Sequence, residues 1–158
     1  MSFLLHPIAH VQASRPQAQD DHWGGERARI TLVPPLTAEA LRGLEAFSHI
    51  EVIFLFHQVE EAAVVRGARH PRGQARWPEV GIFAQRARHR PNRLGSTICR
   101  LIAVQGAALE VAELDAIDGT PVLDIKPVMA EFLPRSPLRQ PTWSHELMAD
   151  YWAGTEEG

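Results

Sequence analysis

The sequence has little cysteine, since Cys99 is the only one among 158 residues. A single cysteine cannot form a disulfide within the chain, and it cannot anchor a cysteine-rich zinc cluster. Long apolar runs are also missing. The longest one, around Val52 to Phe56, has the length of a strand and not the roughly 20 residues of a membrane-spanning helix. The first residues lack the basic run and the apolar run of a signal peptide. We therefore expect a cytoplasmic protein that does not span a membrane.

Several motifs of common enzyme classes are absent as well. The eight histidines show neither an HExxH motif nor another metal-ligand spacing, so we expect no bound metal. Without a GxSxG elbow, a P-loop or a GxGxxG motif, the usual support for a serine hydrolase, a phosphate-loop NTPase or a Rossmann oxidoreductase is missing.

The length and the apolar fraction of 45% fit a globular chain with one hydrophobic core. We therefore expect a single domain over residues 1–158, with its core in 3–133 and a proline-rich segment and helix in 134–158.

The net charge of −3 conceals a strongly basic segment. Residues 66–100 contain nine arginines and one acidic residue, Glu79, which leaves a net charge of −11 on the remaining chain. Planar guanidinium groups bind phosphate through two parallel hydrogen bonds, so this segment favours a nucleic-acid partner. The alternative is a solvated loop, because arginine supplies fifteen of the sixteen basic residues throughout the chain.

Short apolar segments with β-branched and aromatic residues predict strands. They lie at 3–11, 29–33, 50–56, 80–84, 96–104, 108–114 and 121–125. Because strands do not alternate regularly with helices, the pattern disfavours a nucleotide-binding α/β sheet and favours an all-β barrel or sandwich.

Two helices and two loops complete the expected organisation. Thr37 is a good N-cap for a short helix that ends near Gly43, and Ser144 could cap a C-terminal helix that stops at Gly154. The second helix would place apolar residues on one side: Leu147, Met148, Tyr151 and Trp152. Residues 12–26 and the arginine-rich stretch 65–78 are expected to be loops, the latter long and mobile.

Three segments have residues suited to chemistry. In 81–95, arginines surround a turn at Pro91 and Asn92. Residues 114–127 concentrate three aspartates and the only lysine around Asp118-Gly119, which is alternatively a plain hairpin turn. His57 follows the most apolar strand, where it is either a functional group or a satisfied core residue.

These segments resemble the motifs of the TsaA-like, or YaeB/TrmO, family. The matching stretches are 43–49, 54–58, 81–95 with its Arg-Pro-Asn core, and 114–127 with Asp-Gly-Thr-Pro-Val-Leu-Asp-Ile-Lys-Pro. The resemblance implies a small closed β-barrel of about seven strands that binds S-adenosylmethionine as a homodimer. It also implies methylation of N6 of the threonylcarbamoyladenosine beside the tRNA anticodon.

The resemblance further implies a set of cofactor-binding residues. Carboxylates such as Asp115 or Asp118 would favour the cationic sulfonium, and Arg86 would hold the methionine carboxylate. Trp23 would stack on adenine or lie against the sulfonium. The full set is Asp21, His22, Trp23, His57, Gln58, Arg86, Ser96, Leu114, Asp115, Ile117, Asp118, Gly119 and Thr120.

On the substrate side, Asp124 and His57 are the candidates for the base that accepts the N6 proton. The residues expected near the RNA are Arg90, Asn92, Arg93 and Lys126, while the arginine-rich loop would contact the anticodon arm. Two other functions stay open: a non-catalytic RNA-binding barrel, and a methyltransferase that acts on a small molecule. The chain departs from the family pattern at Gln85, Ala87, Arg93 and Val128.

Overall fold

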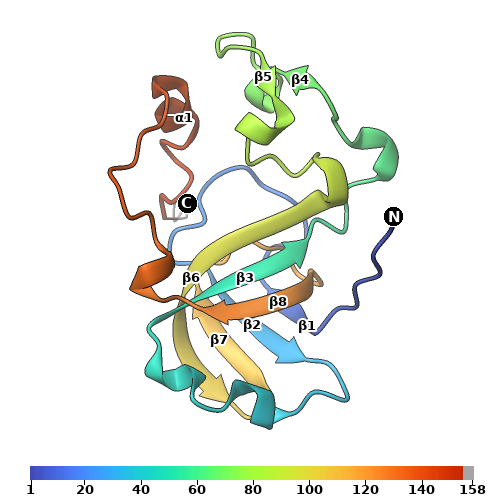
Figure 1. The fold of residues 1–158 in the computed structure, drawn as a ribbon, viewed down its shortest axis with the longest axis vertical. Coiled ribbons are helices and arrows are strands. Elements are labelled where there is room, and N and C mark those ends of the chain that lie inside the picture. Colours follow the sequence, from blue (N-terminus) through green and yellow to red (C-terminus); the bar gives the residue numbers. More distant parts are fainter. Residues whose placement is uncertain (155–158) are drawn as a thin grey trace.

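The computed structural model describes residues 1–154, and its centre is a closed antiparallel β-barrel (Figure 1). Its six strands follow the order β1-β2-β7-β6-β3-β8. They are β1 (Ala9–Ala13), β2 (Arg27–Leu32), β3 (His49–Leu55), β6 (Leu94–Gln105), β7 (Ala108–Ala112) and β8 (Pro121–Pro127). The expected all-β barrel is confirmed. It has six strands where about seven were expected, because the segment predicted at 80–84 lies outside the barrel.

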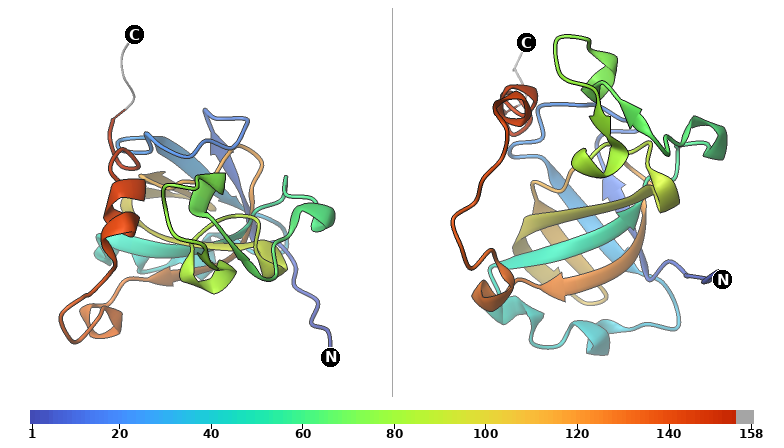
Figure 2. Two further views of the ribbon diagram at one scale, coloured as in Figure 1. Left: turned by 90° about the horizontal axis from the view of Figure 1, so that it is seen from above. Right: turned by 45° about the horizontal axis from the view of Figure 1, so that its top comes forward.

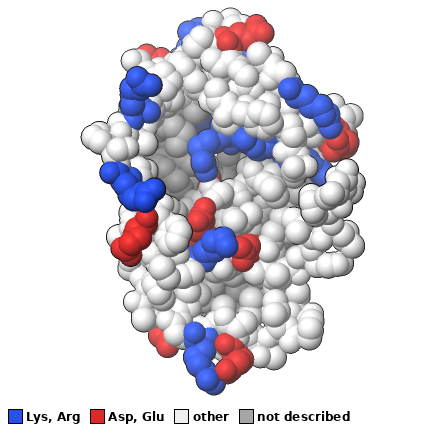
Figure 3. Space-filling model, in the orientation of Figure 1, with Lys and Arg blue, Asp and Glu red and all other residues white. Residues whose placement is uncertain are grey.

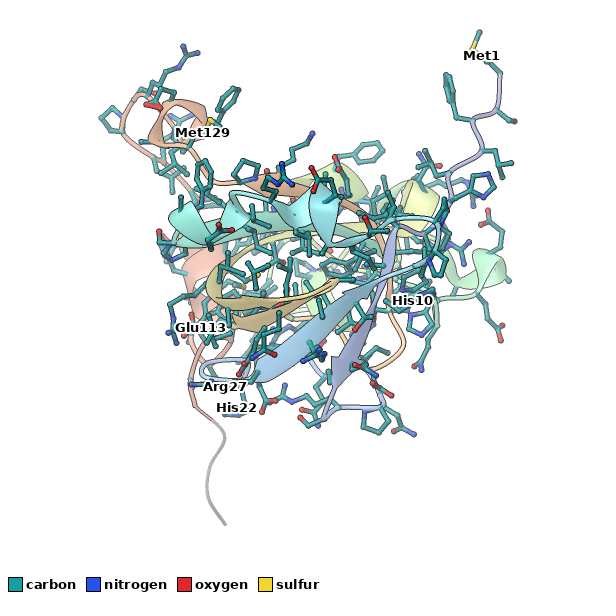
Figure 4. All side chains as sticks on the ribbon, turned by 90° about the horizontal axis from the view of Figure 1, so that it is seen from below. Met1, His10, His22, Arg27, Glu113 and Met129 are labelled. Atoms are coloured by element: carbon teal, nitrogen blue, oxygen red, sulfur yellow. The ribbon has the colours of Figure 1, made fainter. Side chains whose placement is uncertain are left out.

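Alternating apolar side chains fill the barrel interior. On β3, Ile50, Val52 and Phe54 are at most 2% exposed, whereas the residues between them face outward and are half-buried. β2 shows the same alternation, with Ala28, Ile30 and Leu32 buried, whereas four of the five residues of β7 are buried. Figure 4 shows the side chains of the barrel packed between its strands. This period of two is what a sheet with one face on the core requires.

The first strand is shorter at its start than predicted. It begins at Ala9, so the expectation of a strand from residue 3 is wrong. Phe3, Leu4 and Leu5 are exposed, and Pro7 interrupts the chain because it has no backbone N–H for a ladder. Figure 4 shows Met1 at the end of a tail that projects away from the barrel. The strand also continues to Ala13, which shortens the predicted loop 12–26.

The helices are short. Thr37 caps a 3₁₀-helix, η1 (Ala38–Leu41), by accepting a hydrogen bond from the Glu39 N–H at 3.4 Å, as predicted. The C-terminal helix α1 (Thr142–Leu147) starts and ends earlier than expected. Pro141 is its N-cap, Ser144 lies inside it, and it ends before Met148, so the expected end at Gly154 is wrong. The remaining 3₁₀ turns are η2 (Leu44–Ala46), η3 (Glu61–Ala63), η4 (Pro71–Gly73), η5 (Ile82–Ala84), η6 (Pro91–Arg93) and η7 (Ala130–Phe132). No helix within residues 1–154 is long and apolar enough to cross a membrane.

The arginine-rich stretch is better structured than an irregular loop. Within it, β4 (Ala68–Arg69) pairs with β5 (Val80–Gly81), and we call residues 68–81 the β4–β5 lobe. Trp77 is 3% exposed, and its indole N–H donates to Glu146 of α1 at 2.9 Å. The prediction of a loop over 65–78 is therefore wrong in this part, because a two-residue strand pair and a buried tryptophan organise it.

The C-terminal segment, residues 142–154, lies beside the loop that follows β1. The backbone N–H of His22 donates to the Asp150 carbonyl at 3.0 Å, and that of Trp23 donates to the Tyr151 carbonyl at 2.8 Å. Figures 1 and 2 show this segment and the β4–β5 lobe standing at the same end of the barrel. Residues of both parts line one cleft together with residues of the barrel.

Candidate functional site

A cleft of about 1230 Å³ lies where the barrel end meets the β4–β5 lobe and the C-terminal segment. In Figure 3, arginine side chains lie around the hollow in the upper half of this face. The lining comes from six parts of the chain: 18–23, 51–59, 69–73, 83–98, 115–120 and 143–152. Such a cleft has ample room for a ligand of nucleoside size.

The cleft brings together eight of the thirteen cofactor-binding residues predicted from the sequence. These are Trp23, His57, Gln58, Arg86, Ser96, Asp115, Ile117 and Thr120. They belong to four separate stretches of sequence, so only the folded barrel places them in one site.

The other five predicted cofactor-binding residues lie outside the cleft lining. Asp21 holds the Arg72 guanidinium at 2.9 and 3.1 Å, and Leu114 is a core residue. Asp118 accepts the Ala13 backbone N–H at 3.0 Å. His22 contacts the Gly154 carbonyl through Nδ1. Gly119 has a φ of 80°, and a Cβ built on it would lie 3.8 Å from His57 Nε2.

Asp115 is the acidic residue with the best-defined contacts in the cleft. Its Oδ1 accepts a hydrogen bond from Thr97 Oγ1 at 2.5 Å, and its Oδ2 accepts one from the Tyr151 hydroxyl. Burial, and next the charge of Asp115, raise the pKa of Tyr151 well above its usual range. Burial also raises the pKa of Cys99 to about 12, with a smaller contribution from Asp115.

The arginines of the cleft are held by backbone carbonyls and acidic side chains. Arg86 donates to the Ser96 carbonyl at 2.5 Å, and Arg90 donates to the Gln85 carbonyl at 2.6 Å. Arg88 lies 3.6 Å from the Asp20 carboxylate. The Gln85 side chain donates to the carbonyls of Arg69 and Val80 at 3.1 and 3.0 Å, so it ties the β4–β5 lobe to this wall. Gln85 is one of the positions where the chain departs from the family pattern.

The two candidate bases occupy different places. His57 lines the cleft, and burial lowers the pKa of His57, helped by the nearby charge of His10. Its imidazole is therefore neutral near pH 7 and able to accept a proton. Asp124 lies outside the cleft lining on β8, where Lys126 Nζ is 3.0 Å from its carboxylate.

Of the four residues predicted near the RNA, two line the cleft and two do not. Arg90 and Asn92 line the cleft. Arg93 and Lys126 do not, since Arg93 donates to the Val59 carbonyl at 2.5 Å and Lys126 pairs with Asp124. Within residues 1–154, no group of three His, Cys, Asp or Glu side chains is placed to hold a metal ion.

Phe83 and Tyr151 are two of the cleft residues that the sequence did not identify as part of a site. Phe83 is 76% exposed at the cleft, with the Arg90 guanidinium carbon 6.0 Å from its ring centre. The sequence placed Phe83 in a short strand, but η5 turns it outward while Ile82 stays buried. The sequence predicted Tyr151 only on the apolar side of a C-terminal helix. No local pattern in the sequence predicts its hydrogen bond to Asp115.

Comparisons with known proteins agree with this architecture. The sequence model of the family described as tRNA-methyltransferase O N-terminal domain matches residues 10–132. A putative S-adenosylmethionine-dependent methyltransferase RcsF of Pseudomonas aeruginosa is 39% identical over 137 residues, which cover 80% of this chain and 55% of the relative. The tRNA (adenine(37)-N6)-methyltransferase of Escherichia coli K12 is 43% identical over 111 residues, with coverages of 65% and 46%.

A solved structure shows the same likeness in three dimensions. The crystal structure of TrmO from Pseudomonas aeruginosa aligns with a TM-score of 0.73 at 30% identity, covering 90% of this chain and 62% of that one. The chain spans about half the length of the first curated relatives that it matches. The resemblance seen in the sequence motifs is confirmed. Since the family match extends over most of the barrel, this chain belongs to the tRNA-methyltransferase O N-terminal domain family.

Proposed function

We propose that this chain is an S-adenosylmethionine-dependent methyltransferase that acts on N6 of the threonylcarbamoyladenosine beside the tRNA anticodon. One observation carries the proposal: the cleft unites an arginine, a carboxylate, a neutral histidine and a basic rim in a barrel of this family. The printed names of the Pseudomonas aeruginosa and Escherichia coli relatives, a methyltransferase that depends on S-adenosylmethionine and one that acts on tRNA adenine 37, support it.

The charges of the cleft fit the cofactor. The methionine part of S-adenosylmethionine carries a carboxylate and a cationic sulfonium only a few bonds apart. Arg86 is bonded to the Ser96 carbonyl and Asp115 to the Thr97 hydroxyl, so neighbouring residues of β6 hold one cation and one anion side by side. Arg86 would bind the carboxylate, and Asp115 would face the sulfonium. Ile117 and Trp23 would supply apolar surface for the adenine.

Methyl transfer requires mainly that the nucleophile and the methyl group are held in the correct geometry. When bound, S-adenosylmethionine supplies an electrophilic methyl group. The new N–C bond forms as the C–S bond breaks, and N6 loses one proton. The walls of the cleft would hold N6 in line with the methyl group, which accounts for most of the rate. His57, neutral and in the cleft lining, would accept the proton directly or through a water.

The basic rim would bind the RNA. Five arginines line the cleft: Arg69, Arg72, Arg86, Arg88 and Arg90. Guanidinium groups at the mouth would contact phosphates of the anticodon arm, and Asn92 could contact the base. Phe83 exposes its ring at the same mouth, where an unstacked adenine could stack on it. Arg93 and Lys126 would contribute only outside the cleft.

The proposal also covers the domain organisation and the oligomeric state of the protein. The C-terminal segment lines the cleft of the barrel, which supports one working unit over 1–158. We keep the homodimer expected from the family resemblance. A tRNA substrate would be met in the cytoplasm. Sedimentation equilibrium would show whether the protein is dimeric.

Isothermal titration with S-adenosylmethionine tests the proposed function. We expect one site per chain, and we expect R86A to weaken binding by about 1–3 kcal/mol because a charge-assisted hydrogen bond is lost. Binding must be followed by transfer of a labelled methyl group to threonylcarbamoylated tRNA. Binding without transfer to any RNA would favour a non-catalytic RNA-binding barrel. Transfer that is insensitive to salt would favour a small-molecule substrate. No binding at millimolar concentration by the folded protein would contradict the proposal.

A further inference from the structure

The C-terminal segment contributes a partly buried hydroxyl to the cleft. The Tyr151 hydroxyl donates a hydrogen bond to Asp115 Oδ2, although the two residues are 36 positions apart in the sequence. Thr97 Oγ1 donates to the other oxygen, Oδ1, at 2.5 Å. Since each oxygen accepts one hydrogen bond from a different wall, the Asp115 carboxylate is held in a single orientation at the cleft.

The Tyr151 hydroxyl is itself held firmly. The Tyr151 ring packs edge to face against the Trp152 ring, with 5.0 Å between ring centres. Its backbone carbonyl accepts the Trp23 N–H at 2.8 Å, which fastens this part of the segment to the loop after β1. Burial and the neighbouring Asp115 raise the pKa of Tyr151, so the phenol keeps its proton and remains a donor.

We propose that Tyr151 is a positioning residue of the cofactor site, which holds Asp115 so that its carboxylate faces the sulfonium of S-adenosylmethionine. This inference rests on the proposed function and deepens it. It assigns to the C-terminal segment the discrimination between the cationic cofactor and its neutral product.

The physical reason lies in the charge that is lost in the reaction. S-Adenosylmethionine carries a positive sulfonium, whereas S-adenosylhomocysteine carries a neutral thioether of nearly the same shape. A carboxylate at a fixed position attracts the first compound and not the second. A carboxylate that is free to rotate away loses this preference. The ratio of the two dissociation constants therefore reports on the orientation of Asp115.

The test compares this ratio in the unchanged protein and in Y151F, which keeps the ring and removes only the hydroxyl. We expect Y151F to bind S-adenosylmethionine about tenfold more weakly and S-adenosylhomocysteine within about twofold of the unchanged protein. T97V removes the hydrogen bond to the other oxygen and should change the ratio in the same direction. In the D115N background, Y151F should have no further effect on the ratio, because the two residues act through one carboxylate.

A matched control separates positioning from support of the segment. Glu146 accepts the Trp77 indole N–H at 2.9 Å and so anchors α1, but it does not line the cleft. E146A loosens the same segment without removing a hydrogen bond from Asp115. We expect the ratio of the two dissociation constants to stay unchanged in E146A. Thermal melting followed by circular dichroism shows whether each variant is folded.

The outcomes are distinct. Equal weakening of both ligands in Y151F would show that Tyr151 only supports the segment, and unchanged affinities for both ligands would show that it does not orient Asp115; each overturns the inference. If Y151F does not fold, T97V decides the question by the same ratio. If the unchanged protein binds neither ligand, the proposed function fails and the inference fails with it. If it binds both with equal affinity, only the inference fails.

Discussion

Gly95 of β6 lies directly opposite Phe54 of β3, and a Cβ built on Gly95 would come within 2.5 Å of the Phe54 ring. Phe54 is 2% exposed and packs edge to face against Phe56, with 5.3 Å between ring centres. The ring therefore has little room to move aside. Both residues also line the cleft, so this close approach shapes the end of the barrel where the site lies.

We expect G95A to destabilise the protein by about 1–3 kcal/mol, because the added methyl overpacks a buried ring. The free energy of unfolding from urea titration measures this change. G81A is the matched control, since nothing lies within 4 Å of a Cβ built there and its φ is an ordinary −59°. Equal stability of G95A and the unchanged protein would mean that the Phe54 ring can move at little cost.

The barrel was predictable from the sequence because its signal is local. Alternation on β3 and the hairpin of β6 and β7 around Gln105 appear in consecutive residues, so these three predicted strands differ from the observed ones by only one or two residues at their ends. The N-cap at Thr37 was found for the same reason. The family motifs then identified residues of the cleft that no periodicity could have shown.

The features that the sequence did not predict depend on contacts between distant parts of the chain. β4 and β5 have two residues each, too few for a visible period, and they are stabilised by their mutual pairing and by the buried Trp77. Tyr151 meets Asp115 across 36 positions. Asp118 is a reasonable ligand by its chemistry, but it is directed toward the Ala13 backbone N–H and away from the cleft lining. Such placements follow from tertiary packing and have no local signature.

Phe83 offers a direct test of the substrate side. We expect F83A to weaken tRNA binding by about 1–3 kcal/mol, because one base would lose its stacking partner. F83W should restore most of the affinity, and binding of S-adenosylmethionine should not change. The matched control is F132A, which removes a ring that is 86% exposed outside the cleft. Equal tRNA affinities of F83A and F132A would exclude a stacking role for Phe83.

Two arginines from different segments converge on the same part of the cleft. The charges of Arg88 and Arg69, after burial, lower the pKa of His89, so both guanidinium groups lie near one imidazole. If they contact phosphates, neutralising them as R69Q and R88Q should reduce the slope of log affinity against log salt by about 0.7–0.9 for each lost contact. Filter binding of tRNA at several salt concentrations measures the slope.

The control for this experiment is R42Q. Arg42 follows η1, pairs with Glu39 at 2.6 Å and does not line the cleft. We expect its substitution to leave the salt slope unchanged. If R69Q and R88Q bind tRNA with the slope of the unchanged protein, these two arginines make no contact with the phosphates.

His57 predicts a specific pH dependence of the methyl-transfer rate. Burial, and then His10, lower the pKa of His57 from its ordinary value of 6.5. The base is active when neutral, so the rate should rise with pH through this lowered pKa and level off by about pH 7. The same shift affects stability: the folded protein binds this proton more weakly than the unfolded chain, so the free energy of unfolding falls as pH drops below 6.5 and is unaffected above it.

Single-turnover rates measured between about pH 5 and 8 separate this histidine from its neighbour in the cleft. The pKa of His89 is also lowered, by burial and by Arg88, so its titration could produce a similar curve. We expect H57Q to lose the rise of rate with pH and H89Q to retain it. A rise that survives in H57Q and disappears in H89Q would assign the titration to His89. A rate independent of pH in the unchanged protein would show that N6 loses its proton without a histidine base, and that placement in the cleft is sufficient for transfer.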